Sequence, residues 1–358
     1  MTRLDRLRAR MEATGTDLVA IAPGAHMQWL MGFAPHPDER PCLLLVGPDK
    51  AGFVMPGLNA GDARQHTDLP FWEWRDDDGA DAALAGALDA VGASPRKVAV
   101  DETMRADHAL LLLDALPNVG RAFTEDTLGH LRMLKEPAEL AALEDNARIA
   151  DAAQTALRAA IREGITEREL VEIAKGTFAE HGAQMHFGIV GTGAHSSYPH
   201  HHTGGTAVRP GDAIVVDIGA TKDGYFSDIT RMACLGPLPD GYEEVHAVVE
   251  AAVQAALAAI RPGVEARAVD AAARDVIAEA GYGEYFTHRT GHGLGSEVHE
   301  PPYITAANPL TLEENMVFTV EPGIYLPGRF GVRLEEVAVV TAKGCRILSG
   351  LSRDVHVA

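Results

Sequence analysis

Five side chains in the second half of the chain constrain its fold more than any other feature, because each lies within a strand-like segment or between glycines. They are Asp217, Asp228, His292, Glu321 and Glu335. A carboxylate next to buried apolar residues is unfavourable unless a partner neutralises it. All five side chains can bind metal ions, and four carboxylates balance the charge of two divalent cations. We therefore expect a fold that gathers these residues around two metal ions.

Asp217 and Asp228 are predicted to project from one face of a β-hairpin. Asp217 lies near the end of the apolar run Ala213–Ile218, and the Asp223-Gly224 pair that precedes Asp228 is a strong signal for a tight turn. A turn at this pair makes the two acids diagonal neighbours, and a turn one residue earlier places them directly opposite each other. Both registers leave them roughly 5–8 Å apart, where their charges repel unless a cation lies between them. The alternative is a surface hairpin with two aspartates facing solvent.

His292 and Glu321 lie where the backbone is expected to turn sharply. His292 is in the segment Thr290–Gly295 (TGHGLG), whose glycines allow the backbone to approach another group closely. A lone histidine is more often structural or exposed than a ligand, but here four acids accompany it in the sequence. Glu321 ends the strand-like segment Val317–Glu321 and is followed by Pro-Gly. These positions favour side chains aimed into a shared site.

Glu335 and its neighbour Glu336 are predicted to face opposite ways. The segment Gly331–Val340 (GVRLEEVAVV) is typical of a single strand, in which alternate side chains share a face. Arg333 and Glu335 then lie on one face, while Glu336 projects from the other. We therefore expect Glu335 at the site, with Arg333 behind it as an orienting partner.

The pattern of elements divides the chain near residue 125. Short strands and helices alternate in residues 1–125, which predicts a small α/β domain with its own core. Residues 126–358 begin with helical segments, one of which starts at a capping box formed by Thr166 and Glu169. Strands joined by glycine- and proline-rich turns follow, with two long helices at Gly241–Ile260 and Ala266–Ala280. This grouping is typical of an α+β domain with a curved antiparallel sheet.

Composition and charge exclude several classes of protein. Aspartate and glutamate outnumber lysine and arginine by 51 to 31, and the net charge of −20 disfavours nucleic acid and acidic membranes as partners. The three cysteines are far apart, which argues against a disulfide framework and against a thiolate zinc site. The N-terminal segment lacks the apolar core of a signal peptide, and no apolar run approaches the roughly 20 residues needed to span a bilayer. We therefore expect a cytoplasmic protein.

The segments around the five residues resemble those of a known family. The segments are IVVDIGA, YFSDITR, HRTGHGLGSEVHEPP, FTVEPGIY and GVRLEE, with RMLKEPAE and GAHSSYPH upstream. They resemble the pita-bread metallopeptidases, the family of methionine aminopeptidase, prolidase and creatinase. WLMGF and ERP, near the start of the chain, are similar to the amino-terminal domain of Xaa-Pro peptidases. The resemblance implies a pita-bread catalytic domain, in which helices cover a curved antiparallel sheet, preceded by a smaller creatinase-like α/β domain.

The resemblance also implies what the five residues bind. In the family they are the ligands of two divalent metal ions, and the residues corresponding to Asp228 and Glu335 bridge both ions. Ligation dominated by carboxylates favours Mn²⁺, with Co²⁺, Zn²⁺ and Fe²⁺ as alternatives.

Further residues acquire roles by the same resemblance. Glu321 carries a proton to the leaving amine in addition to binding metal, His299 stabilises the oxyanion, and His200 holds the substrate. Arg333 and His288 are expected to orient these groups without binding the metals themselves.

The activity implied by the resemblance is hydrolysis of Xaa-Pro bonds in dipeptides by a hydroxide that bridges the two metals. The expected partner is a small peptide, and the expected assembly is a homodimer. Alternatives are aminopeptidase P, which acts on longer Xaa-Pro peptides, and a non-peptide amide hydrolase or lyase on the same site. A catalytically inactive peptide-binding module is a further alternative, which the retention of all five residues disfavours.

The chain departs from the family at a few histidines. His26 and His195 each stand where the family usually has asparagine, and the run His200-His201-His202 is unusual. These departures concern the substrate rather than the metal site, whose five residues are all present.

Overall fold

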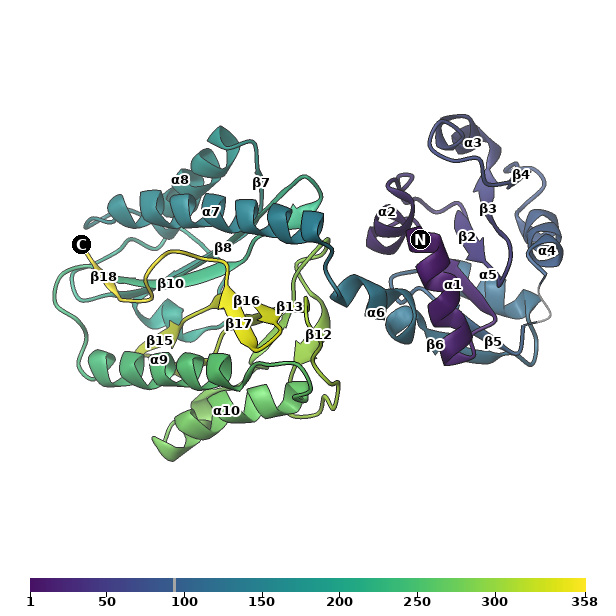
Figure 1. The fold of residues 1–358 in the computed structure, drawn as a ribbon. Helices are drawn as coiled ribbons and strands as arrows, with labels where there is room; N and C mark the ends of the chain where they lie inside the picture. Colours follow the sequence, from purple (N-terminus) through teal and green to yellow (C-terminus); the bar gives the residue numbers. More distant parts are fainter. Residues whose placement is uncertain (93–94) are drawn as a thin grey trace. The chain divides into compact units, whose positions relative to one another are not determined.

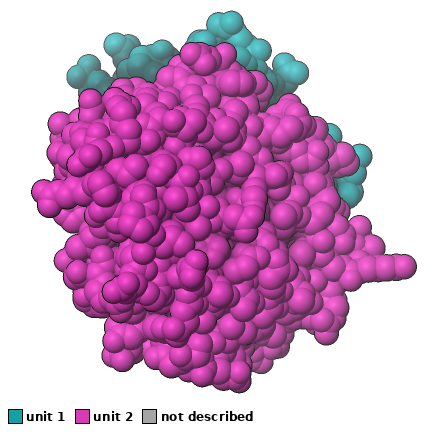
Figure 2. All heavy atoms as spheres, turned by 90° about the vertical axis from the view of Figure 1, so that its left-hand side faces the viewer, with its two compact units in different colours: residues 1–132 teal, residues 133–358 magenta. Residues whose placement is uncertain are grey.

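The computed structural model describes residues 1–92 and 95–358, which form two compact units, Met1–Arg132 and Met133–Ala358 (Figure 2). The division falls after the predicted boundary at residue 125. Helix α6 (Leu128–Met133) lies at the division, and its Leu128 and Leu131 are buried in a core of the first unit. No helix in the described part of the chain is long and apolar enough to cross a membrane.

The first unit is built on one mixed sheet. Its strands are β1 (Leu18–Ile21), β2 (Leu43–Val46), β3 (Ala51–Pro56), β4 (Phe71–Trp74), β5 (Lys97–Val100) and β6 (Gly120–Phe123), in the spatial order β4-β3-β2-β1-β5-β6. Its helices are α1 (Arg3–Thr14), α2 (Ala25–Met31), α3 (Gly57–Ala63), α4 (Asp81–Ala90) and α5 (Ala106–Ala115). Alternate residues of β1 supply two cores, with Val19 and Ile21 in one and Leu18 and Ala20 in the other. The predicted α/β domain is thereby confirmed.

The second unit places antiparallel strands between helices (Figure 1). Its helices are α7 (Pro137–Ala159), α8 (Glu167–Glu180), α9 (Tyr242–Ala259) and α10 (Ala266–Glu279). The first group of strands is β7 (Gln184–Thr192), β8 (Ala213–Lys222), β9 (Tyr225–Phe226) and β10 (Ile229–Cys234), with β18 (His356–Val357) added in parallel to β10. The second is β11 (Gly291–Gly293), β12 (Glu300–Ile304), β13 (Val317–Val320), β16 (Glu336–Thr341) and β17 (Gly344–Ile347). β14 (Gly323–Leu326) and β15 (Phe330–Arg333) form a separate hairpin.

The predicted helix positions in the second unit are confirmed. The segments expected at Gly241–Ile260 and Ala266–Ala280 are α9 and α10. The capping box also forms, because the Thr166 hydroxyl accepts a hydrogen bond from the Glu169 amide and the Glu169 carboxylate accepts one from the Thr166 amide. The α+β class of this unit follows from the same pattern.

Strand β8 separates two hydrophobic cores and thereby positions Asp217. Its even-numbered residues from Ile214 to Ala220 pack in the core that contains α7 and α8. Ala213 and Val215 pack in the core that contains α9 and α10. Because strand side chains alternate, Asp217 lies on the same face as Ala213 and Val215. The acid is therefore buried inside the unit. Its strand, β8, lies between the helices α7 and α8 on one side and α9 and α10 on the other (Figure 1).

The prediction of a single strand at Gly331–Val340 is wrong. β15 ends at Arg333 and β16 begins at Glu336, so Leu334 and Glu335 lie between them. β15 pairs with β14, whereas β16 pairs with β13 and β17. The chain therefore changes sheet at this point, which a pattern of alternating residues does not reveal.

Candidate metal centre

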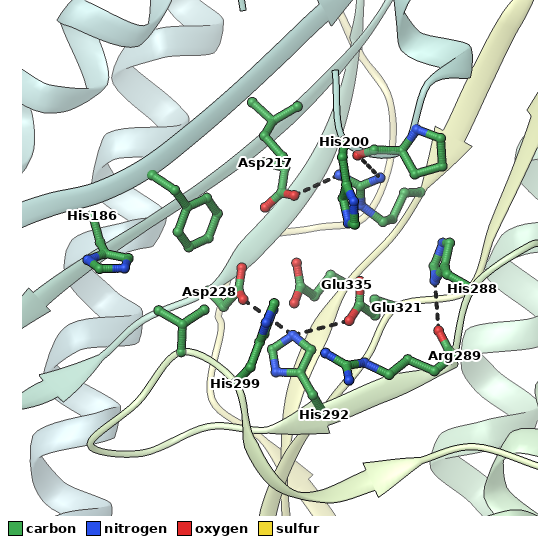
Figure 3. Close-up of a pocket in the computed structure, with 15 residues that line it drawn as sticks. His186, His200, Asp217, Asp228, His288, Arg289, His292, His299, Glu321 and Glu335 are labelled. Carbon is green, nitrogen blue, oxygen red and sulfur yellow. Dashed lines mark hydrogen bonds and ion pairs between the residues drawn. The ribbon is translucent and has the colours of Figure 1, made fainter. Parts of the chain in front are cut away.

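All nine residues predicted for the site line one cavity of about 570 Å³ in the second unit (Figure 3). They come from segments that are far apart in the sequence. They are His200, Asp217, Asp228, His288, His292, His299, Glu321, Arg333 and Glu335.

The hairpin register places Asp217 and Asp228 as diagonal neighbours. Asp223 and Gly224 have positive φ angles of 54° and 79°, as a type I′ turn requires. Asp217 consequently pairs with Thr230 across β8 and β10. The predicted register with the turn at Asp223-Gly224 is thus confirmed. Asp228 precedes β10, in the short interruption after β9, and its side chain points toward the cavity (Figure 3).

His292 directs one ring nitrogen at two carboxylates. Its Nδ1 lies 3.1 Å from the Gly293 carbonyl oxygen and donates to it. Its Nε2 lies 3.2 Å from Glu321 Oε1 and 3.6 Å from Asp228 Oδ2. A proton or a metal cation must therefore lie between Nε2 and these oxygens. Burial opposes ionisation of Glu321, but the hydrogen bond to His292 and its charge outweigh burial and lower the pKa of Glu321 to about 2.

Glu335 faces the cavity, and Glu336 faces away from it. The Thr230 hydroxyl donates to Glu335 Oε2 at 2.8 Å, which leaves Oε1 without a partner among the described residues. Glu336 accepts hydrogen bonds from the guanidinium groups of Arg231 and Arg353, at 2.9 and 2.8 Å. Glu335 and Glu336 thus point in opposite directions, as predicted, although the strand is interrupted between Arg333 and Glu336.

Burial and mutual repulsion oppose ionisation of three of the carboxylates. Burial, followed by the charges of Glu335 and Asp217, raises the pKa of Asp228 well above its ordinary value. Burial and the charges of Glu321 and Asp217 do the same to the pKa of Glu335. Burial also raises the pKa of Asp217, although Arg333 opposes this shift. Divalent cations would remove the repulsion and allow all of these groups to ionise.

The donor set fits divalent cations. Asp228, His292 and Glu335 each offer a ligand atom within 4.8 Å of those of the other two. In the described part of the chain, Asp217 Oδ1 and Glu335 Oε1 are buried and lack any hydrogen-bond partner. Buried carboxylate oxygens without partners are costly, and a cation is the partner that four acids and one imidazole suit.

A hydrogen-bonded chain supports Asp217 from behind. Arg333 donates to Asp217 Oδ2 at 2.6 Å and to the Tyr325 hydroxyl oxygen at 2.9 Å. His288 Nδ1 donates to the Arg289 carbonyl at 2.7 Å, so its Nε2 accepts from the Tyr325 hydroxyl at 2.8 Å. The Tyr325 hydroxyl thus links Arg333 to His288. This arrangement fixes the tautomer of His288 and the orientation of the Asp217 carboxylate.

His200 and His299 project into the same cavity (Figure 3). The ring of His299 packs edge-on against that of His292, with centroids 4.1 Å apart. Burial, and then the charges of His292 and Arg289, lower the pKa of His299 to about 4. His299 is consequently neutral near pH 7 and can donate a hydrogen bond without adding charge.

Three residues of the site were not predicted from the sequence. Thr230 links Arg333 to Glu335, because its hydroxyl accepts from Arg333 Nε at 3.2 Å and donates to Glu335. Tyr325 connects Arg333 with His288, and Arg289 lines the cavity. All three lie within segments already singled out, YFSDITR, FTVEPGIY and HRTGHGLG, so their proximity to the ligands in sequence was the available signal.

Comparisons with known proteins agree with this geometry. The chain matches metallopeptidase family M24 over residues 141–342 and the creatinase/prolidase N-terminal domain over residues 3–134. It is 39% identical over 349 residues to a probable dipeptidase PepE of Mycobacterium tuberculosis, covering 96% of this chain and 92% of that protein. It is 34% identical over 379 residues to an Xaa-Pro dipeptidase of Lactobacillus helveticus, covering 99% and 98%.

A solved structure is also similar over nearly the whole chain. The dipeptidase PepE from Mycobacterium ulcerans has a TM-score of 0.94 and 36% sequence identity, with 99% of this chain and 96% of that one covered. The chain therefore belongs to metallopeptidase family M24 and carries a creatinase/prolidase N-terminal domain before its metallopeptidase domain.

Proposed function

We propose that this protein hydrolyses Xaa-Pro bonds in dipeptides, with two divalent cations, preferably Mn²⁺, bound by the five ligands. The observation that carries the proposal is the convergence of these ligands in one cavity, where two buried carboxylate oxygens lack partners among the described residues. The similarity to an Xaa-Pro dipeptidase supports the choice of bond. In this proposal residues 126–358 form the catalytic domain and residues 1–125 the amino-terminal domain.

The residues around the ligands have separate tasks in the proposed reaction. When bound, two divalent cations supply Lewis acidity and lower the pKa of an attacking water. Glu321, whose low pKa keeps it ionised, accepts a proton and passes it to the leaving amine. The neutral imidazole of His299 donates to the oxyanion, and His200 donates to the substrate backbone.

Arg289 favours a short substrate with a free carboxylate. Arg333 already donates to Asp217, Tyr325, Thr230 and a backbone carbonyl, so four of its five N–H groups are engaged. The guanidinium of Arg289 stacks on Tyr303, 4.6 Å from the ring centroid, and points into the cavity (Figure 3). No carboxylate in the described residues forms an ion pair with it. Once cations neutralise the four acids, Arg289 is the cation available to the carboxyl terminus of a dipeptide.

Arg289→Met is expected to lower kcat/KM for Ala-Pro by about 10- to 100-fold, the value of a lost charge-assisted hydrogen bond. Hydrolysis of Ala-Pro amide, which lacks the carboxylate, should change little. The measurement is the ratio of kcat/KM for the acid and the amide, with Arg267→Met, at an exposed arginine, as the control. An unchanged ratio in Arg289→Met would refute the role of Arg289 while leaving the proposed hydrolysis intact.

A substrate panel tests the activity itself. With Mn²⁺ present, the protein is expected to cleave Ala-Pro and Met-Pro but not Ala-Pro-Ala or Met-Ala-Ser, and chelation should abolish turnover until Mn²⁺ is restored. Product formation measured by chromatography decides among the alternatives. Cleavage of Ala-Pro-Ala would indicate an aminopeptidase P, and full activity after removal of all metal would contradict the proposal.

The proposal also covers assembly and location. We propose a homodimer, since exposed Leu58, Leu110 and Phe123 offer apolar surface on the first unit. We also propose a reducing cytoplasmic location, with which the three free cysteines are consistent.

A further inference from the structure

A second group of metal-binding side chains lies outside the lining of the cavity. Glu167, His195 and His201 offer ligand atoms that are all within 4.8 Å of one another. Glu167 is the first residue of α8, and His195 lies in the 3₁₀ turn Gly193–Ser197 that follows β7. None of the three lines the cavity of the metal centre.

The three side chains are already arranged around one carboxylate. His195 Nδ1 lies 2.9 Å from Glu167 Oε1, and His201 Nε2 lies 3.0 Å from Glu167 Oε2. The two imidazole rings face each other, with centroids 4.4 Å apart and planes 31° apart. Ligands around tetrahedral Zn²⁺ lie about 2.0–2.2 Å from the ion, so donor atoms about 3.3 Å apart are needed. Small shifts of the rings from their present positions provide this spacing.

Backbone amides hold the carboxylate from its other side. The amides of Thr192 and Gly204 donate to Glu167 Oε1 and Oε2, both at 3.0 Å. Outer hydrogen bonds of this kind orient metal ligands in proteins and increase affinity. The Glu167 side chain is fully buried, yet its hydrogen bonds to His201 and His195 outweigh burial and lower its pKa. The carboxylate is therefore ionised and fixed in place.

The group is accessible and differs chemically from the main site. The side chain of His195 is 38% exposed, so an ion can reach the carboxylate from solvent. Two imidazoles and one carboxylate suit Zn²⁺ and similar borderline cations, whereas four carboxylates and one imidazole suit Mn²⁺. Water can complete the coordination on the exposed side.

We propose that Glu167, His195 and His201 form a further metal site, which takes one Zn²⁺-class cation and is separate from the two-metal centre. The ion takes the place of the two imidazole N–H protons that now bond to Glu167, and each neutral ring then carries its single proton on its other nitrogen. His195 and His201 bracket the segment that contains Pro199 and His200, and both of these residues line the catalytic cavity. A bound ion thus ties together the two ends of the segment that presents His200 to the substrate.

The test counts metal ions rather than turnover. Protein saturated with Mn²⁺ is equilibrated with a small excess of Zn²⁺ over protein, freed of unbound ions and analysed by elemental mass spectrometry. The variants are His195→Asn and His201→Asn. The matched control is His181→Asn, because His181 is an exposed histidine at the C-terminal end of α8. The wild type and the control are expected to retain one metal ion per chain more than either site variant.

The difference in count is informative whether or not the two-metal centre is filled, because that centre is intact in all of these proteins. Exchange of Zn²⁺ for Mn²⁺ in the main site leaves the total unchanged. An equal total in the wild type and His195→Asn overturns the proposal. Thermal unfolding provides a second readout, because Zn²⁺ should raise the midpoint more in the wild type than in His195→Asn, and an equal rise would also overturn it.

Discussion

Glu335→Gln is expected to lower kcat/KM by on the order of 10³-fold or more and to reduce the content of bound metal, whereas Glu336→Gln should leave the metal content unchanged. Glu335 faces the cavity with one buried oxygen that has no partner in the described part of the chain. An amide can offer that site one neutral oxygen but no charge, so the cations lose both a ligand and a compensating negative charge. Weaker binding of the cations removes several kcal/mol of transition-state stabilisation.

The free energy of unfolding should show the opposite order, with a larger loss in Glu336→Gln than in Glu335→Gln. Glu336 pairs with Arg231, which is fully buried, and with Arg353, so Glu336→Gln leaves buried positive charge without compensation. Its free energy of unfolding should fall by about 3–5 kcal/mol. Metal-free Glu335→Gln should be at least as stable as the metal-free wild type, because one repelling carboxylate is gone. Equal metal loss in both variants, measured by elemental analysis beside denaturant unfolding, would contradict the assignment of Glu335.

After removal of the metals, the buried acids of the site are expected to lower the free energy of unfolding as pH rises. In the metal-free protein the pKa values of Asp217, Asp228 and Glu335 are raised, so the native state keeps protons that the unfolded chain releases above pH 3.8 to 4.5. The unfolded state then binds fewer protons, and stability falls as pH rises from about 4 through the raised native values. The slope is about 1.4 kcal/mol per pH unit for each proton retained.

Glu321 contributes with the opposite sign, but in another range. Its pKa is lowered to about 2, so its contribution is complete above pH 4.5 and is lost only as pH falls toward 2. The lowered pKa values of His288 and His299 also oppose the acids below about pH 6.5, where the unfolded chain protonates these rings and the native state does not. A variant that keeps both histidines but lacks raised acids therefore isolates the slope that the acids contribute.

Urea unfolding at pH 5 and pH 8 measures this effect, with and without Mn²⁺. Relative to a variant that lacks two of the raised groups, the metal-free protein should lose stability between pH 5 and pH 8, and the stabilisation by Mn²⁺ should grow with pH, because binding releases the retained protons. A double variant, Asp228→Asn with Glu335→Gln, is the control, since it lacks two of the raised groups and should show a flatter slope. A metal-free wild type whose stability rises between pH 5 and pH 8 relative to this control would disprove the account.

Local chemistry explains why part of the site could be predicted from the sequence. The Asp223-Gly224 turn determines the register of its own hairpin, so the relation of Asp217 to Asp228 depends on a few adjacent residues. The separation of Glu335 from Glu336 depends only on neighbouring residues facing opposite ways. It therefore survives a strand interruption that the alternating pattern does not reveal.

Contacts between distant segments explain the rest. Tyr325 joins His288 to Arg333 only because the β14–β15 hairpin packs beside the segment before β11, and no local pattern encodes that approach. Glu167 has the sequence context of an ordinary first-turn acid, beside a capping box. Its contacts with His195 and His201 arise when the loop after β7 folds over the start of α8. The helix could be predicted, but the cluster could not.

The joint between β15 and β16 has a consequence for how this protein can vary in length. Each strand is anchored in a different sheet, and the two adjacent acids between Arg333 and Val337 face opposite environments. Loss or gain of one residue here would exchange their places. The cavity would lose a carboxylate, and the buried Arg231 would lose its counterion. This segment can therefore accept some changes of residue type but no insertion or deletion, a constraint on spacing that residue identities alone do not express.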